Sequence, residues 1–228
     1  MILLAIDTAA SLCAACIYDD ETGAELGREV LDIGKGHAER LIGVIESALK
    51  QAGLAYADLD RIGVSIGPGS FTGVRVGVAT ARGLALALSI PAIGVNTLEA
   101  LAAEAHAGFP DRPTLTAIDG RRGDIYCAVY APDGSALSKP AAISTADAVS
   151  LARRHGVALT GNGADAILAA TDGDALFVTG LRSATADIGF YARLAAAREA
   201  TGEKPKPLYL RGADAKPQSG FALARTGS

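Results

Sequence analysis

The chain has 228 residues, of which 50% are hydrophobic and 20% charged, and its formal net charge at pH 7 is −4. This composition is typical of a globular protein with ample core-forming residues. The negative charge excludes a general electrostatic attraction to nucleic acid, so a contact with RNA would have to be local or made by a partner. The apolar run at residues 1–6 is too short for a signal sequence and no basic segment precedes it. We therefore expect a cytoplasmic protein without a membrane contact.

The first hundred residues alternate strand and helix patterns. Strands with period-2 alternation or buried-type composition are expected at 2–7, 12–18, 26–32, 62–66 and 92–95. Helical spacing is expected at 37–54, 72–89 and 97–106, with Gly53 ending the first of these helices. Within the strand at 12–18, Cys13 and Cys16 would face opposite sides, so we interpret them as small buried residues and not as a redox pair.

The pattern starts again near residue 114. Leu4-Ala5-Ile6-Asp7 is echoed by Thr116-Ala117-Ile118-Asp119, and the strand at 15–18 is echoed by residues 128–131. This repeat predicts two related α/β halves, each a three-strand meander followed by helices, with helices of the second half at 145–155 and 185–201. We place the two domains at 1–110 and 111–211. Residues 212–228 lose periodicity and are predicted to form a flexible tail.

A duplicated meander with an aspartate after each first strand is typical of the actin and sugar-kinase superfamily. We therefore predict an actin-like, ribonuclease H-like fold of two mixed sheets flanked by helices. In that superfamily the paired aspartate turns hold nucleotide phosphates and metal. Here Thr8-Ala9-Ala10 replaces the usual glycine-containing turn, so ATP hydrolysis is not expected and weak ATP or ADP binding is left open. The structural alternative is that Asp7 and Asp119 simply turn the strand ends.

The most specific segment is G-P-G-S-F-T-G-V-R-V-G at residues 67–77, between a strand and a helix. Free amides at a helix start suit an anion, but the segment lacks the lysine of a Walker loop and the third glycine of a dinucleotide loop. Its chemistry alone leaves a structural loop and a phosphate site equally open. The residues that could contribute to weak nucleotide or anion binding are Asp7, Thr8, Gly67, Gly69, Ser70 and Asp119.

This segment, following L-A-I-D-T-A near the N-terminus, resembles the TsaB family of bacterial threonylcarbamoyladenosine biosynthesis proteins. Further matches are G-V-N-T-L-E-A-L-A at 94–102, I-D-G-R-R-G-D-I-Y at 118–126 and P-L-Y-L-R at 207–211. The resemblance implies a non-catalytic subunit that pairs with its catalytic paralogue TsaD. With the small ATPase TsaE, the pair supports transfer of threonylcarbamoyl to the adenosine beside the tRNA anticodon, and tRNA is reached through the complex. The resemblance also implies self-association as a homodimer through the two helices of the first domain.

The helix at 72–89 is apolar nearly all round, so we expect it to be covered by core or by another subunit. Gly73, Gly77 and Ala81 form a stripe that a second helix could approach closely; alternatively the stripe packs on the sheet of its own domain. The predicted surface for TsaD and for the homodimer comprises His37, Leu41, Ile45, Gly73, Arg75, Gly77, Ala81 and Leu84.

The nearest resemblance to a metal motif is His37-Ala38-Glu39-Arg40-Leu41. Metal-binding relatives carry a second histidine where Leu41 stands, so no metal is expected and His37 is interpreted as solvated or capping. Arg121 and Arg122 beside Asp124 are surface charge or an RNA or partner contact. The alternative functions are an ATP-binding enzyme of the same superfamily, a glycoprotease-like metallopeptidase, and a stand-alone homodimeric interaction module.

Overall fold

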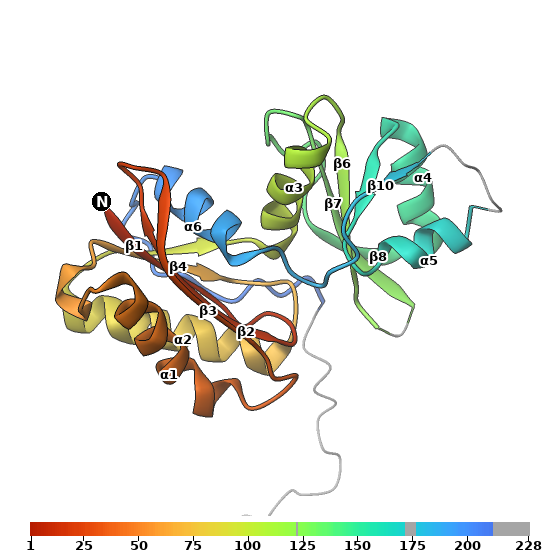
Figure 1. Cartoon of the computed structure of the whole chain (residues 1–228). Helices are drawn as coiled ribbons and strands as arrows, with labels where there is room; N and C mark the ends of the chain where they lie inside the picture. The colour runs from red at the N-terminus through yellow and green to blue at the C-terminus, as the bar shows by residue number, and fades with distance from the viewer. Residues whose placement is uncertain (122, 172–176, 212–228) are drawn as a thin grey trace, which may run out of the picture.

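A computed structural model describes residues 1–121, 123–171 and 177–211 of the chain. The predicted tail at 212–228 and Arg122 lie outside the described residues. Two α/β parts lie side by side, each built around one five-stranded sheet (Figure 1).

The first sheet has the strand order β3-β2-β1-β4-β5. Neighbouring strands of the β1-β2-β3 meander are antiparallel, whereas β4 and β5 add in parallel beyond β1. Its strands are Ile2–Asp7 (β1), Leu12–Asp19 (β2), Ala24–Asp32 (β3), Arg61–Ser65 (β4) and Ala92–Val95 (β5). The helices of this region are His37–Ala52 (α1), Tyr56–Asp58 (the 3-10 helix η1), Phe71–Leu88 (α2) and Thr97–Gly108 (α3).

The second sheet repeats this topology in the order β10-β9-β6-β7-β8. The meander β6-β7-β8 is antiparallel, and β9 and β10 add in parallel beyond β6. Its strands are Thr114–Asp119 (β6), Asp124–Tyr130 (β7), Ala141–Ser144 (β8), Ala158–Thr160 (β9) and Val178–Thr179 (β10), and the helices are Thr145–His155 (α4), Ala164–Ala169 (α5) and Ile188–Ala197 (α6). The predicted duplicated, actin-like fold of two mixed sheets is confirmed.

One detail of the predicted repeat is wrong. Ala5 pairs with Cys16 in the first sheet and Ala117 pairs with Cys127 in the second, so Cys16 and Cys127 are equivalent. The strand at 15–18 therefore corresponds to residues 126–129 and not to 128–131. Asp7 pairs with Ala14, seven positions later, whereas Asp119 pairs with Ile125, six positions later, so the register of the second hairpin is shifted by one residue.

Three buried clusters divide the molecule into layers. Helices α1 and α2 cover one face of the first sheet, α4 and α5 cover the far face of the second, and α3 and α6 pack between the two sheets. Helix α6 comes from the C-terminal part of the chain and packs on the first sheet (Figure 1). The predicted domain boundaries at residues 110 and 111 stay a prediction.

The orientation of the cysteines in β2 is confirmed. Cys13 lies in the cluster beneath α1 and α2, and Cys16 lies in the cluster between the two sheets, so the two thiols face opposite sides. Both thiols and Cys127 are free and buried.

Candidate functional site

Asp7 stands at the carboxyl end of β1 and is only 1% exposed. Its Oδ1 accepts a hydrogen bond from the Ala9 amide at 2.9 Å, which closes the turn toward β2. Its Oδ2 accepts one from the Thr185 hydroxyl at 2.6 Å, and that hydroxyl lies 2.7 Å from the hydroxyl of Tyr191 on α6. Asp7 therefore joins the end of β1 to a helix from the other end of the chain.

The Asp7 carboxyl belongs to a closed network. Burial raises its pKa above the ordinary value, while hydrogen bonds from Ser65, Thr185 and the Ala9 amide act in the opposite direction. Burial, and then the charge of Asp7, also raises the pKa of the fully buried Tyr191. Because both Asp7 oxygens already have partners and almost no solvent contact, they are poorly placed to bind a metal-nucleotide complex.

Asp119 holds the equivalent place at the end of β6, but its side chain is exposed. Its Oδ1 accepts a hydrogen bond from the Arg121 amide at 2.8 Å, which repeats the contact between Asp7 and Ala9. Its own amide donates to Asn162 Oδ1 at 3.0 Å. Both aspartates thus turn a strand end, as the structural alternative predicts.

The glycine-rich segment packs directly on the turn that follows β1. The Ser70 amide donates to the Ala9 carbonyl at 2.6 Å, and the Thr8 hydroxyl donates to the Gly73 carbonyl at 2.7 Å. A Cβ atom at Gly73 would stand 2.0 Å from the Thr8 carbonyl oxygen, and one at Gly77 would stand 2.5 Å from Thr8 Oγ1. Glycine is needed at these positions because α2 lies this close to the turn.

The residues predicted to contribute to nucleotide binding are thus only partly brought together. The turn after β1 and the glycine-rich segment lie against each other, and this joint contains Asp7, Thr8, Gly67, Gly69 and Ser70. Their polar groups largely form hydrogen bonds within the chain. Asp119 belongs to the second sheet. These contacts favour a structural role for the glycine-rich segment, and weak ATP or ADP binding stays a prediction. Two cavities of the described residues lie elsewhere: about 320 Å³ at the C-terminal end of α2 and about 300 Å³ between β8 and α4.

Most of the predicted association surface is buried in the chain itself, so that part of the prediction needs correction. His37, Leu41, Ile45, Gly73, Gly77 and Ala81 all face the first sheet or its turns and cannot touch a partner directly in this structure. The small-residue stripe packs on its own domain, which is the alternative left open by the sequence. Arg75 is exposed and Leu84 half-buried.

His37 itself is neither solvated nor the cap of its helix. It is 7% exposed, and its Nε2 lies 3.1 Å from the Leu12 carbonyl oxygen, while Gly36 occupies the capping position. The interpretation of His37 as a solvated or capping residue is therefore wrong, because α1 packs its first turn against the start of β2.

The outward faces of α1 and α2 carry exposed apolar residues. Leu86 is 76% exposed and Ile42 46% exposed. Gly43 and Gly83 lie within these helices, and a Cβ at either would meet nothing within 4 Å. Helix α2, expected to be covered on every side, is therefore left uncovered on one face by the residues that the structure describes. We refer to the set Ile42, Gly43, Gly83 and Leu86 as the outward face.

Helix α2 also meets the length and composition of a membrane span, alone among the described helices, and 28% of it is buried. One such helix is weak ground for a membrane assignment, because core helices of soluble proteins have the same composition.

The sequence did not single out a cluster at the N-terminal end of α2. The guanidinium carbon of Arg75 lies 3.6 Å from the centre of the Phe71 ring, and Arg75 Nε donates to the Tyr209 hydroxyl at 2.8 Å. The family-like strings at 67–77 and 207–211 contain these three residues, but nothing in the sequence indicated that the two strings meet. In the segment 207–211, Arg211 forms an ion pair with Asp124 at the start of β7. The sequence had placed Arg121 beside Asp124, but the ion pair that the structure shows is with Arg211.

Within residues 1–121, 123–171 and 177–211, no group of three or more His, Cys, Asp or Glu side chains is placed to hold a metal ion. Whether the purified chain carries a metal stays a prediction.

Comparison with known proteins shows that the chain is similar to tRNA-modification proteins. The family described as TsaD, tRNA N6-adenosine threonylcarbamoyltransferase, matches residues 32–207. The tRNA threonylcarbamoyladenosine biosynthesis protein TsaB of Escherichia coli is 35% identical over 137 residues, 60% of this chain and 58% of that protein. TsaB of Bacillus subtilis is 38% identical over 131 residues, 57% of this chain and 55% of that protein. The matches thus span less than two thirds of these relatives.

The fold similarity extends further along the chain than the sequence similarity. The solved structure of YeaZ from Pseudomonas aeruginosa is similar over 92% of this chain and 99% of that chain, with a TM-score of 0.73 and 25% sequence identity.

Proposed function

Because this chain belongs to the family of the tRNA N6-adenosine threonylcarbamoyltransferase TsaD, as a protein of the TsaB/YeaZ type, we propose that it acts in the biosynthesis of threonylcarbamoyladenosine in tRNA as a non-catalytic partner of TsaD. The proposed partners also include the ATPase TsaE and a second copy of the chain. tRNA is reached through the complex, in the cytoplasm, and no firmly bound cofactor is required.

A non-catalytic role is supported by the use of Asp7 and the glycine-rich segment. In an actin-like enzyme these positions would serve the nucleotide. Here the Asp7 oxygens accept hydrogen bonds from Ala9 and Thr185, and Thr8 and Ser70 bond across to the neighbouring backbone. The groups that would perform chemistry therefore hold the domain together.

The observation that carries the partnership is the outward face of α1 and α2. Gly43 and Gly83 each cost about 1 kcal/mol relative to alanine in a helix, and no described residue requires a missing side chain there. Leu86 leaves about three quarters of its surface in water. A partner helix packed on this face would account for all three residues. It could approach the backbone closely at the two glycines, and it would bury Leu86.

The test is to mix the chain with TsaD, with Leu86→Asp as the variant and Leu181→Asp as the matched control. Leu181 is 58% exposed and lies in the second part of the molecule, away from the outward face. Burying a leucine is worth about 1.5–3 kcal/mol, so Leu86→Asp should weaken complex formation about tenfold or more. The control should bind normally, and circular dichroism checks that both variants fold.

Restored tRNA modification by the wild-type mixture, lost with Leu86→Asp, is the expected functional result. Normal binding by Leu86→Asp would contradict the assignment of this face. ATP turnover or stoichiometric zinc in the isolated chain would instead favour the enzyme alternatives, the superfamily kinase and the metallopeptidase respectively.

A further inference from the structure

Two exposed aromatic rings lie together at the N-terminal end of α2. Phe71 is 57% exposed and Tyr209 51% exposed, and they are the only aromatic residues among the large exposed hydrophobic side chains of the described chain. Their ring centres are 5.7 Å apart. Arg75 lies over both, 3.6 Å from the Phe71 ring centre and 5.6 Å from that of Tyr209. We call these three residues the aromatic cluster.

The cluster is held in place by contacts that are independent of any ligand. The Leu208 amide donates to the Ile66 carbonyl at 2.8 Å, and Leu210 packs against the buried layer between the sheets. Arg211 then pairs with Asp124 of β7. Tyr209 is therefore fixed on both sides along the chain, so little ordering is needed for a ligand to use its ring.

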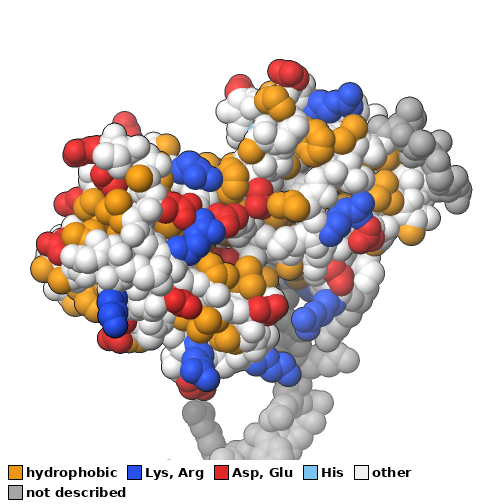
Figure 2. Space-filling model, viewed as in Figure 1, with side chains coloured by type: hydrophobic (Ala, Val, Ile, Leu, Met, Phe, Trp, Pro, Cys, Tyr) orange, Lys and Arg blue, Asp and Glu red, His pale blue; other side chains and the backbone are white. Residues whose placement is uncertain are grey.

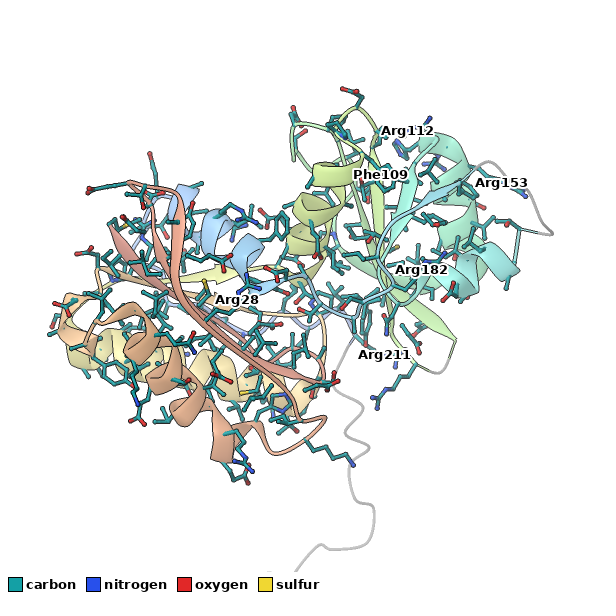
Figure 3. The ribbon with its side chains drawn as sticks, viewed as in Figure 1. Arg28, Phe109, Arg112, Arg153, Arg182 and Arg211 are labelled. Carbon is teal, nitrogen blue, oxygen red and sulfur yellow. The ribbon has the colours of Figure 1, made fainter. Side chains whose placement is uncertain are left out.

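The charge of Arg75 is not neutralised by a carboxylate among the described residues. Some other arginines pair with carboxylates: Arg28 with Glu25 and Asp187, and Arg198 with Glu99. Figure 3 shows Arg28 beside α6, and Asp187 is the N-cap residue of that helix. Arg75 instead uses its Nε on the Tyr209 hydroxyl, and its two terminal nitrogens have no hydrogen-bond partner in the described chain.

Exposed rings with an unneutralised guanidinium match the chemistry of single-stranded RNA binding. Bases stack on aromatic faces without regard to sequence, and arginine binds the adjoining phosphate. A large basic field is not needed for such a local contact, and none is present on the face in Figure 2, where acidic and basic side chains are interspersed.

We propose that the aromatic cluster binds one unpaired nucleotide of an RNA strand, with the base stacked on the rings of Phe71 and Tyr209 and its phosphate on Arg75. This inference rests on the proposed function and extends it, because it assigns to this chain a direct RNA contact of its own. Phe71 and Arg75 lie in the N-terminal part of α2, whereas Gly83 and Leu86 lie near its C-terminal end, so the RNA and the partner on the outward face contact different ends of one helix.

The test uses the full chain alone and a single-stranded RNA oligonucleotide containing 2-aminopurine, whose fluorescence is quenched on stacking. Titrations at several low salt concentrations give both the affinity and its salt dependence. Losing a stacked ring should weaken binding about 5- to 100-fold in Phe71→Leu and Tyr209→Leu. Tyr209→Phe, which keeps the ring, should retain the quenching. Arg75→Gln should reduce the slope of log affinity against log salt by about 0.7, the value for one phosphate of a single strand.

Arg112→Gln is the matched control for charge. Figure 3 shows Arg112 at the opposite end of the second part from Arg211, far from the segment that carries Tyr209. Binding and salt slope should be unchanged in this variant. Circular dichroism confirms that each variant is folded.

The inference is overturned if the chain does not bind the oligonucleotide at low salt, or if Phe71→Leu and Tyr209→Leu bind it like the control. Loss of TsaD binding in these variants without any RNA binding by the wild type would identify the cluster as a protein contact, which also overturns it. If the chain does not bind RNA but its mixture with TsaD still restores tRNA modification, the proposed function remains intact and only this inference fails. RNA binding by a chain that does not associate with TsaD refutes the partnership alone.

Discussion

Replacing Gly73 or Gly83 by alanine makes the same chemical change on one helix and should change stability in opposite directions. A Cβ at Gly73 would stand 2.0 Å from the Thr8 carbonyl oxygen, whereas ordinary van der Waals contact begins near 3.4 Å. The backbone oxygen cannot rotate away, so the first turn of α2 and the turn after β1 must separate. At Gly83 the new methyl group meets nothing within 4 Å.

The size of each effect follows from this geometry. Overpacking of this kind costs about 1–3 kcal/mol, and the separation strains the hydrogen bonds from Thr8 and Ser70, each worth about 1 kcal/mol. After about 1 kcal/mol is returned by the helix propensity of alanine, Gly73→Ala should lose about 2–4 kcal/mol. Gly83→Ala should gain about 0.5–1 kcal/mol.

Thermal unfolding followed by circular dichroism measures the difference. For a chain of this length 1 kcal/mol shifts the melting temperature by about 2–4 °C, so Gly73→Ala should lower it by about 4–16 °C and Gly83→Ala should raise it by about 1–4 °C. Sizing at the same concentration excludes a contribution from self-association. A Gly73→Ala variant as stable as the wild type would refute the account of the glycine-rich segment as a joint packed on the Thr8 turn.

Two further predictions follow from buried groups. Burial raises the pKa of Asp7 in the folded state, so the ionised carboxylate destabilises the fold. The free energy of unfolding, compared with that of Asp7→Asn, should therefore fall as the pH rises from the ordinary pKa of aspartate through the raised one. Urea unfolding of both proteins from acid to neutral pH measures this difference, and a difference of the opposite sign would show that the hydrogen bonds to Asp7 outweigh its burial. Burial also raises the pKa of Cys13 to about 11 and those of Cys16 and Cys127 to about 12, so a thiol reagent at neutral pH should label none of them until urea is added. Rapid labelling of the native chain would contradict the buried positions.

The sequence by itself determined the elements whose signals are local. The short apolar runs at 2–7 and 12–18, bounded by turn residues, predict the first strands of the meander because strands buried on both faces need continuous apolar residues. A turn role for Asp7 and Asp119 was one of the two alternatives that the sequence left open, and in the structure each carboxylate accepts a hydrogen bond from the amide two residues later. Strands β9 and β10 and helix α5 were missed, since two to six residues are too few to show a period.

The tertiary structure alone decided which neighbour each residue meets. The spacing of Gly73 and Gly77 shows that something approaches α2 closely, but sequence spacing cannot distinguish the turn at Thr8 from a second subunit. Tyr209 reaches Arg75 across 134 residues of sequence, and Thr185 reaches Asp7 across 178. Such contacts are fixed by how the sheets and α6 pack, because periodicity reports only which face of an element is buried and not which distant residue lies against it.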